Sequence, residues 1–120
     1  MQSLTEQELH NLAMNIVGKQ LETEGFEFMA VNSELKKNPQ FVCLKDKKLH
    51  FIVVKSIGYP GDPKDVEFYK ADLNKMKGHA LKFEADTFYA AVGLVNASDY
   101  NLPVYLNEEY IVDYEGLIKI

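Results

Sequence analysis

Two short apolar runs separated by a polar turn constrain this chain more than any other feature. They fall in residues 38–55, NPQFVCLKDKKLHFIVVK, as an apolar run at 41–44, a polar turn at 45–48 and a β-branched run at 49–54. This pattern predicts a β-hairpin of two largely buried strands. The second strand carries a charge near its end, because Lys55 shares a face with Phe51 and Val53. We expect the stem of Lys55 to be covered and its ammonium to face a cleft or the rim of the sheet.

The segments around the hairpin predict two helices and two further strands. Thr5 and Glu8 form a T-x-x-E capping box, and apolar residues then recur at helical spacing until Gly25 provides a stop. Residues 26–32 are expected to form a strand. A turn-rich loop at 57–63 precedes a second helix, whose apolar stripe runs from Val66 to Phe83. The nearly continuous apolar run 87–95 is typical of a strand buried on both faces.

The C-terminal segment, residues 104–120, alternates apolar and polar side chains and predicts one or two strands with one wet face. It contains Tyr105, Tyr110 and Tyr114. These tyrosines either form an exposed aromatic surface for a partner or cover the end of the sheet.

Together these elements predict an α/β protein with a mixed sheet, in the order αβββαβ followed by a C-terminal β extension. We expect a single domain over residues 1–120, with its core at about 5–96 and the extension at about 103–120. A composition of 47% hydrophobic and 26% charged residues is ordinary for a soluble globular domain of this length.

The hairpin resembles the PD-(D/E)xK motif of the restriction-endonuclease-like superfamily, with its acids removed. In that motif a proline and an acid precede one strand, and the next strand ends in Glu-x-Lys. Here Pro39 occupies the proline position, Gln40 the position of the Asp, Val53 that of the Glu, and Lys55 is retained. The order of elements is also similar to that of small archaeal Holliday-junction resolvases.

This resemblance implies a nuclease-like fold whose metal site is depleted. Active members hold Mg²⁺ through two carboxylates, and the metal activates a water while the lysine supports the charged transition state. Glu8 corresponds to a further acid that some of these enzymes carry, although the capping box is the simpler explanation for it. Some members move an active-site acid to the following helix, a part that Asp62, Asp65 or Glu67 would have to play here.

Charge is distributed unevenly along the chain. The net charge is −5, all 13 basic residues are lysines, and eleven of them lie between Lys36 and Lys82 against five acids. The lack of arginine weighs against sequence-specific reading of DNA. Two explanations remain for the lysines in this segment. They form a basic face for a nucleic-acid backbone, or they keep the turn and the exposed edges soluble. The basic face would comprise Lys36, Lys37, Lys45, Lys47 and Lys48.

The leading functional hypothesis is therefore a non-catalytic binding or scaffold domain that uses a remnant cleft at Lys55. One alternative is a nuclease with relocated acids, which alone would require Mg²⁺ or Mn²⁺; another is a self-associating interaction domain that uses the tyrosine-rich tail. The three histidines are scattered and predict no zinc site. The partner is expected to be another protein or a second copy, and no apolar run is long enough for a membrane span. A lone Cys43 and the absence of a secretion signal predict a cytoplasmic location.

Overall fold

The computed structural model describes residues 2–35 and 37–120 and has two α-helices, one 3-10 turn and six strands. In chain order these are α1 (Glu6–Thr23), β1 (Glu27–Val31), β2 (Phe41–Lys45), β3 (Lys48–Ile57), η1 (Glu67–Tyr69), α2 (Lys70–Leu81), β4 (Asp86–Asn96), β5 (Tyr110–Asp113) and β6 (Ile118–Lys119).

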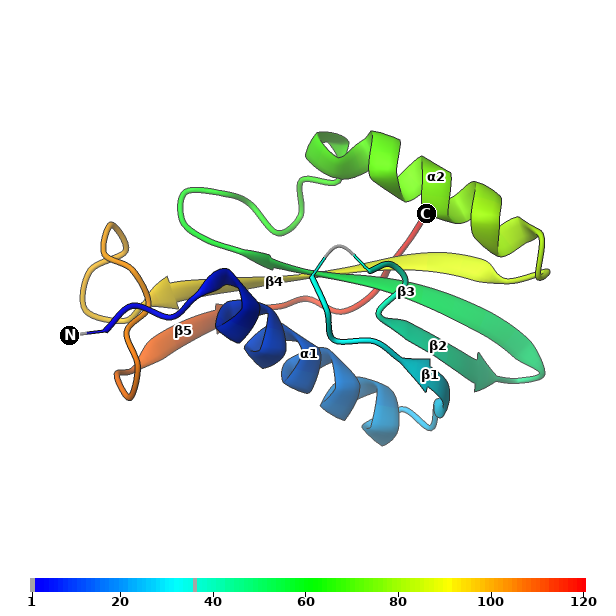
Figure 1. Ribbon diagram of the computed structural model, residues 1–120, viewed down its shortest axis with the longest axis horizontal. Helices are drawn as coiled ribbons and strands as arrows, with labels where there is room; N and C mark the ends of the chain where they lie inside the picture. Colours follow the sequence, from blue (N-terminus) through cyan, green and yellow to red (C-terminus); the bar gives the residue numbers. More distant parts are fainter. Residues whose placement is uncertain (1, 36) are drawn as a thin grey trace.

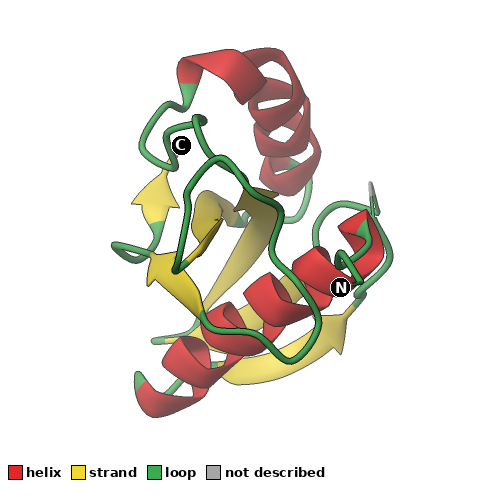
Figure 2. Cartoon of the chain, turned by 90° about the vertical axis from the view of Figure 1, so that its left-hand side faces the viewer, coloured by secondary structure: helices red, strands yellow, loops and turns green. Residues whose placement is uncertain are grey.

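The strands form one mixed sheet with a helix on each of its faces (Figures 1 and 2). The strand order is β1-β2-β3-β4-β5, and β6 also pairs with β4. Only β3 and β4 run parallel, with Phe51 opposite Thr87 and Lys55 opposite Ala91. The long connection through α2 permits this parallel pairing, which a tight turn cannot provide. The predicted mixed α/β fold is confirmed.

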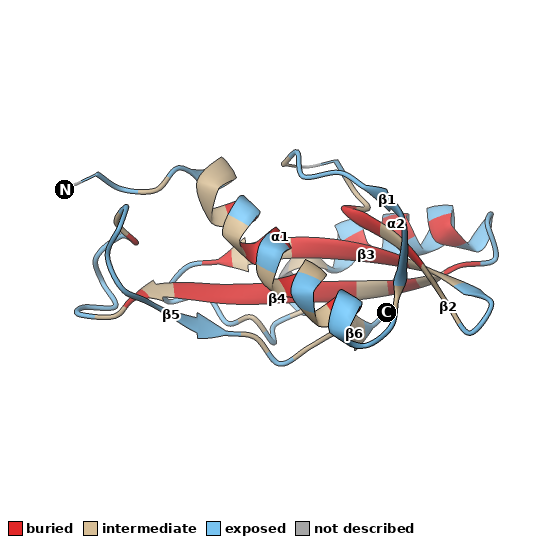
Figure 3. Cartoon of the chain, turned by 90° about the horizontal axis from the view of Figure 1, so that it is seen from below, coloured by how far each residue is buried: buried red, intermediate tan, exposed pale blue. Residues whose placement is uncertain are grey.

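Two hydrophobic clusters hold the layers together, one on each side of the sheet. The α1 cluster includes Val17 and Leu21 of the helix packed on Ile52 and Val54 of β3. The α2 cluster includes Leu73 and Met76 packed on Phe51 and other residues of the opposite face. Figure 3 shows the consequence, since β3 and β4 are buried along most of their length while the edge strand β5 is exposed.

Local signals in the sequence explain the ends of α1 and the hairpin turn. Both halves of the capping box are present, because Thr5 Oγ1 accepts from the Glu8 amide at 3.1 Å and Glu8 Oε1 accepts from the Thr5 amide at 2.9 Å. Gly25 has a φ of 84°, the left-handed conformation that ends helices. Asp46 and Lys47 also have positive φ, as the tight turn between β2 and β3 requires.

Two sequence predictions are wrong in detail. The second helix is shorter than its apolar stripe, because Val66 precedes the 3-10 turn and Phe83 lies beyond α2. Phe83 packs instead against Phe51, with the centres of the two rings 5.7 Å apart. The C-terminal extension contains two strands, β5 and β6, within the predicted number, but residues 104–109 form no strand and β5 is exposed on both faces rather than one. An alternating pattern cannot reveal how much of the extension finds a partner, and here β5 pairs with β4 through Tyr110–Asp113 and β6 pairs with β4 through Ile118 and Lys119.

Tyr89 of β4 offers a direct test of the α2 cluster. Its side chain is fully buried, and its hydroxyl has no hydrogen-bond partner among the described residues. Burial is the main reason that the pKa of Tyr89 is raised far above its usual value. We expect Tyr89→Phe to increase the free energy of unfolding by about 1 kcal/mol, because it removes an unsatisfied buried polar atom without leaving a cavity. Urea unfolding of the two proteins measures this, and a loss of stability would mean that the hydroxyl has a partner in solution.

Candidate functional site

Three adjoining hollows surround the end of β3, and together they form what we call the β3 cleft. The α1-side cavity, about 300 Å³, is lined by Lys55 together with Glu6 and His10 of α1. The α2-side cavity, about 540 Å³, is lined by Lys55, Tyr69 and Asp72 among others. The loop cavity, about 240 Å³, lies between Ser56 and the loop that follows β3. Ligands of open sheets commonly bind beyond the carboxyl ends of parallel strands, which is where this cleft lies.

Lys55 is the residue that joins the first two hollows. Its side chain is partly buried, and its ammonium lies 5.3 Å from the centre of the Tyr69 ring. Within the part of the chain that the structure describes, Lys55 forms no salt bridge. The sequence prediction of a covered stem with the ammonium facing a cleft is confirmed.

Gln40 is fully buried and connects three segments of chain. Its backbone donates to the Ile52 carbonyl at 3.0 Å and accepts from the Asn32 amide at 2.8 Å. Its side-chain oxygen accepts from the Val54 amide at 2.7 Å, and its side-chain nitrogen donates to Asn38 Oδ1 at 2.7 Å. Pro39, which has no N–H, immediately precedes it. The Gln40 side chain therefore satisfies the backbone amide of Val54 in β3, just before β2 begins at Phe41.

Val53 belongs to the α2 cluster and is 2% exposed. It lies on the sheet face of Phe51 and Lys55, because side chains alternate along a strand. Gln40 directly precedes Phe41, whose partner across the hairpin is Ile52, so Gln40 lies beside Val53. The structure thus brings together Gln40, Val53 and Lys55, the three hairpin positions singled out in the sequence.

Glu8 does not join this group. Its carboxylate is bound to the Thr5 amide in the capping box, and its helix packs on the opposite face of the sheet. The α1 residues that line the α1-side cavity are Glu6, Leu9 and His10. Glu8 is therefore a helix cap in this structure.

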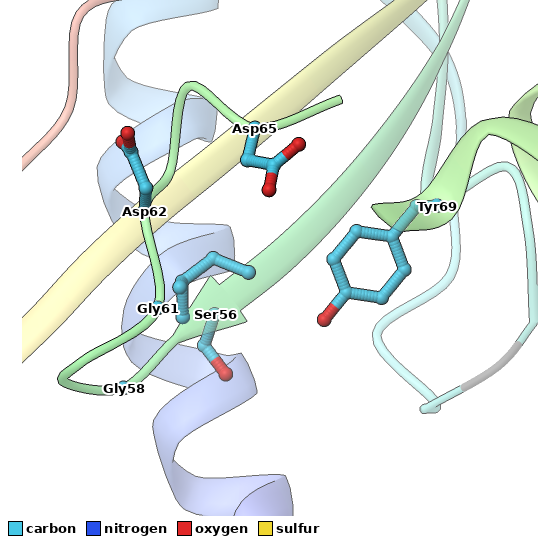
Figure 4. Close-up of a pocket in the computed structure, with 7 residues that line it drawn as sticks. Ser56, Gly58, Gly61, Asp62, Asp65 and Tyr69 are labelled. Carbon is cyan, nitrogen blue, oxygen red and sulfur yellow. The ribbon is translucent and has the colours of Figure 1, made fainter. Parts of the chain in front are cut away.

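The three acids considered as relocated ligands have different surroundings, and Figure 4 shows two of them, Asp62 and Asp65. Asp62 and Asp65 both line the loop cavity. Figure 4 shows that the Asp62 carboxylate points away from Ser56, whereas the Asp65 carboxylate points towards the side of the cavity on which Tyr69 lies. Each also accepts from a backbone amide two residues on, at 2.9 Å and 3.1 Å. Glu67 is exposed and pairs with Lys70 at 3.5 Å. Among the described residues, no group of three His, Cys, Asp or Glu side chains is arranged to hold a metal ion.

The lysines proposed as a basic face do not form one surface. Lys37 lies before β2, whereas Lys45, Lys47 and Lys48 lie at its far end. Lys45 sits 4.7 Å from the centre of the Phe26 ring, and Lys48 pairs with Asp86 at 3.7 Å. Lys36 lies outside the described residues.

The three tail tyrosines are also dispersed. Tyr114 packs against the α1 cluster and donates its hydroxyl to Gln20 Oε1. Tyr105 makes an isolated bridge with Ser3, and Tyr110 is 38% exposed on β5. Tyr114 thus covers the end of the core, and Tyr110 alone is clearly exposed. The buried Cys43 is a core residue, and burial raises the pKa of its thiol to about 11.

Sequence reasoning missed His10, which is 2% exposed and whose Nε2 atom has no hydrogen-bond partner in the described part of the chain. Its position on the apolar face of α1 was visible in the spacing of Leu9, Ala13 and Val17. The sequence does not show that His10 lies near Lys55, because only the tertiary structure brings α1 next to the end of β3.

His10 predicts how stability depends on pH. Burial, and after it the Lys55 ammonium, lower the pKa of His10 from its usual 6.5. Its stabilising effect is therefore fully present above 6.5 and is lost as pH falls from there towards the lower folded pKa, because the unfolded chain binds the proton more readily.

We expect His10→Phe to reduce the loss of unfolding free energy between about pH 7.5 and about pH 5.5. Urea unfolding at the two pH values measures it. An equal loss in both proteins would show that His10 is not buried in its neutral form.

The fold and the cleft define a mixed α/β domain in which Lys55 lies near the end of β3, in the central parallel strand pair, without a salt bridge to any described residue. The chain belongs to the family described as Domain of unknown function (DUF8840), whose profile matches residues 7–120. No curated protein and no solved structure matches the chain. The family match therefore covers every residue that lines the cleft except Glu6. No helix within residues 2–35 and 37–120 is long and apolar enough to cross a membrane.

Proposed function

We propose that this protein is a non-catalytic binding module with a restriction-endonuclease-like core, and that the β3 cleft is its binding surface. The order α1-β1-β2-β3-α2-β4 and the neighbouring positions of Gln40, Val53 and Lys55 support the nuclease-like alignment. In this proposal a protein or a small molecule binds in the β3 cleft and contacts Lys55.

One observation carries the proposal: the two positions that hold the metal in active nucleases are used here by the fold itself. The side-chain amide of Gln40 is hydrogen-bonded to the Val54 amide and to Asn38, and Val53 is buried among apolar side chains. Mg²⁺ requires hard oxygen ligands, chiefly carboxylates, and neither position offers one. Gln40 and Lys55 both line the cleft, and of these two only Lys55 has a charged group, which forms no salt bridge to a described residue.

Calorimetric titration with Mn²⁺ tests the non-catalytic part of the proposal, because Mn²⁺ takes the same oxygen ligands as Mg²⁺. We expect no saturable one-to-one binding to the natural protein at neutral pH. Tight one-to-one binding would contradict the proposal and direct mutagenesis to Asp62, Asp65 and Glu67.

Restoring the acids tests the nuclease-like alignment. The double variant Gln40→Asp with Val53→Glu should gain saturable Mn²⁺ binding, since the two carboxylates would then share the end of the hairpin. A matched control, Gln2→Asp with Val112→Glu, makes the same changes at exposed positions and should gain none. Thermal unfolding with and without Mn²⁺ reads out binding even in a destabilised variant, because a ligand that binds the folded state raises its stability. A folded double variant that Mn²⁺ fails to stabilise would show that the alignment is wrong.

A metal-dependent nuclease with relocated acids is a second candidate, favoured by Asp62 and Asp65 at the loop cavity beside Ser56. It requires Mn²⁺-dependent cleavage of DNA or RNA that Lys55→Ala abolishes. Cleavage that survives this substitution would come from a contaminant or from another site.

A self-associating domain is a third candidate, favoured by β5 at the edge of the sheet. Tyr110, Ile111 and Val112 are 38%, 42% and 43% exposed there, and an exposed apolar edge strand readily pairs with another chain. Sedimentation velocity over a range of concentrations should then show a dimer that Val112→Lys dissociates. A monomer at every concentration would exclude this candidate.

A further inference from the structure

Two residues that line the α1-side cavity, His10 and Lys55, carry side-chain nitrogen atoms without a hydrogen-bond or salt-bridge partner in the described part of the chain. His10 is 2% exposed, and its Nε2 atom has no partner. Lys55, on the same cavity wall, has no salt bridge to any described residue. A buried polar atom without a partner destabilises the folded state, so a ligand that supplies a hydrogen-bond partner here would relieve an existing penalty.

The other polar groups of this cavity do not compete for the same ligand atoms, with one exception. Both polar side-chain atoms of Gln40 already form a hydrogen bond, Oε1 with the Val54 amide and Nε2 with Asn38 Oδ1. Ser56 adds a hydroxyl that can donate. The exception is Glu6, an exposed carboxylate at the start of α1 that lines the same cavity. The set therefore calls for an acceptor group, and the carboxylate of Glu6 opposes a high charge on it.

The charge balance selects among acceptor groups. Among the described residues Lys55 is the one ammonium lining this cavity, while Glu6 here and Asp62, Asp65 and Asp72 in the adjoining hollows are acidic. A phosphate dianion or a polyanionic backbone would be repelled by these acids more strongly than a singly charged group. A carboxylate has one charge and two acceptor oxygens, enough for the ammonium and the imidazole.

We propose that the α1-side cavity binds one carboxylate group between the Lys55 ammonium and the His10 imidazole. This deepens the proposed binding function, on which it rests, by naming the chemistry of the ligand. The imidazole donates from Nε2 and the ammonium supplies the counter-charge, so one carboxylate oxygen lies near each. In the structure Nε2 is shielded from solvent and the Lys55 ammonium lies over the Tyr69 ring, so the proposal requires both side chains to turn towards the cavity when the carboxylate binds.

The test is a titration of the full ¹⁵N-labelled chain with sodium acetate at constant ionic strength, observed by NMR at the His10 imidazole nitrogens and the backbone amides of β3. We expect a saturable shift at His10. Lys55→Met, which keeps the stem but removes the charge, should weaken acetate binding about tenfold or more, since a charge-assisted hydrogen bond is lost. Lys82→Met, the same change at an exposed lysine outside the cleft, should bind as the natural protein does.

Two further variants test the assignment of each group. His10→Phe should weaken binding while its spectrum confirms that the fold is kept, and Glu6→Gln should strengthen it because a competing carboxylate is removed. Equal affinity in the natural protein, Lys55→Met and His10→Phe would overturn the proposal. So would shifts that never saturate, or inorganic phosphate that binds more tightly than acetate.

The source of the carboxylate is distinguished by a second pair of probes, an N-acetylated dipeptide with a free C-terminal carboxylate and the same dipeptide as its amide. Tighter binding of the free acid than of acetate identifies a chain terminus, whereas preference for acetate identifies a small free acid. Equal binding of acid and amide would overturn the proposal. If no carboxylate binds while the Mn²⁺ experiments give their expected results, this inference fails and the non-catalytic binding function stands.

Discussion

Replacing Gln40 with alanine is expected to lower the free energy of unfolding by about 3 kcal/mol, a large effect for one polar side chain. The Gln40 side chain is 1% exposed, and its two polar atoms bond to the Val54 amide and to Asn38. Truncation would leave the Val54 N–H buried without its partner and would open a cavity beside β3. The cost is thus the sum of an unsatisfied donor and lost packing.

Urea unfolding followed by circular dichroism measures this change. Gln2→Ala serves as the control, because Gln2 is exposed and its side chain forms no hydrogen bond in the structure, and it should change stability by less than about 0.5 kcal/mol. If Gln40→Ala were as mild as the control, the bond to Val54 would not be a support of the fold. The position could then still be a former ligand site, but not one taken over by the fold.

The second large effect is expected at Val53, where Val53→Glu should cost about 3 to 5 kcal/mol at neutral pH. The side chain lies in the α2 cluster at 2% exposure, next to the apolar face of α2. A carboxylate introduced there loses its hydration, and Lys55 on the same face compensates only in part. The penalty should shrink as pH falls, because burial raises the pKa of the introduced carboxyl and its neutral form is easier to bury.

Val112→Glu is the matched control, since it makes the same substitution in a strand at a position that is 43% exposed. We expect it to change stability by less than about 1 kcal/mol and to show little dependence on pH. Equal costs at the two positions would mean that Val53 is accessible to water in solution. That result would show that the α2 cluster does not exclude a carboxylate from this position.

Much of the fold could be predicted because its signals are local. The capping box at Thr5 and Glu8, the stop at Gly25 and the two apolar runs of the hairpin each depend on residues close together in the sequence. The shortened second helix and the irregular tail were not predictable in the same way. Their limits depend on which surfaces of β4 and of the α2 cluster remain free to pack, and this is a property of the assembled sheet.

The candidate site divides along the same line. Lys55 was identifiable from the sequence because a charge near the end of an apolar strand requires an explanation, and the structure places it in a cleft. Glu8, Asp62, Asp65 and Glu67 were candidates by residue type alone. Their side chains are committed to a helix cap, turn hydrogen bonds or an exposed ion pair.

The sequence by itself determined the order of helices and strands, the hairpin and the face on which Lys55 lies, because short-range periodicity and turn chemistry specify these features. Only the tertiary structure decided that Gln40 satisfies the backbone of β3 and that His10 meets Lys55 across the α1-side cavity. Those contacts join residues on different elements. Their existence depends on how α1 and the hairpin pack together, which no local pattern encodes.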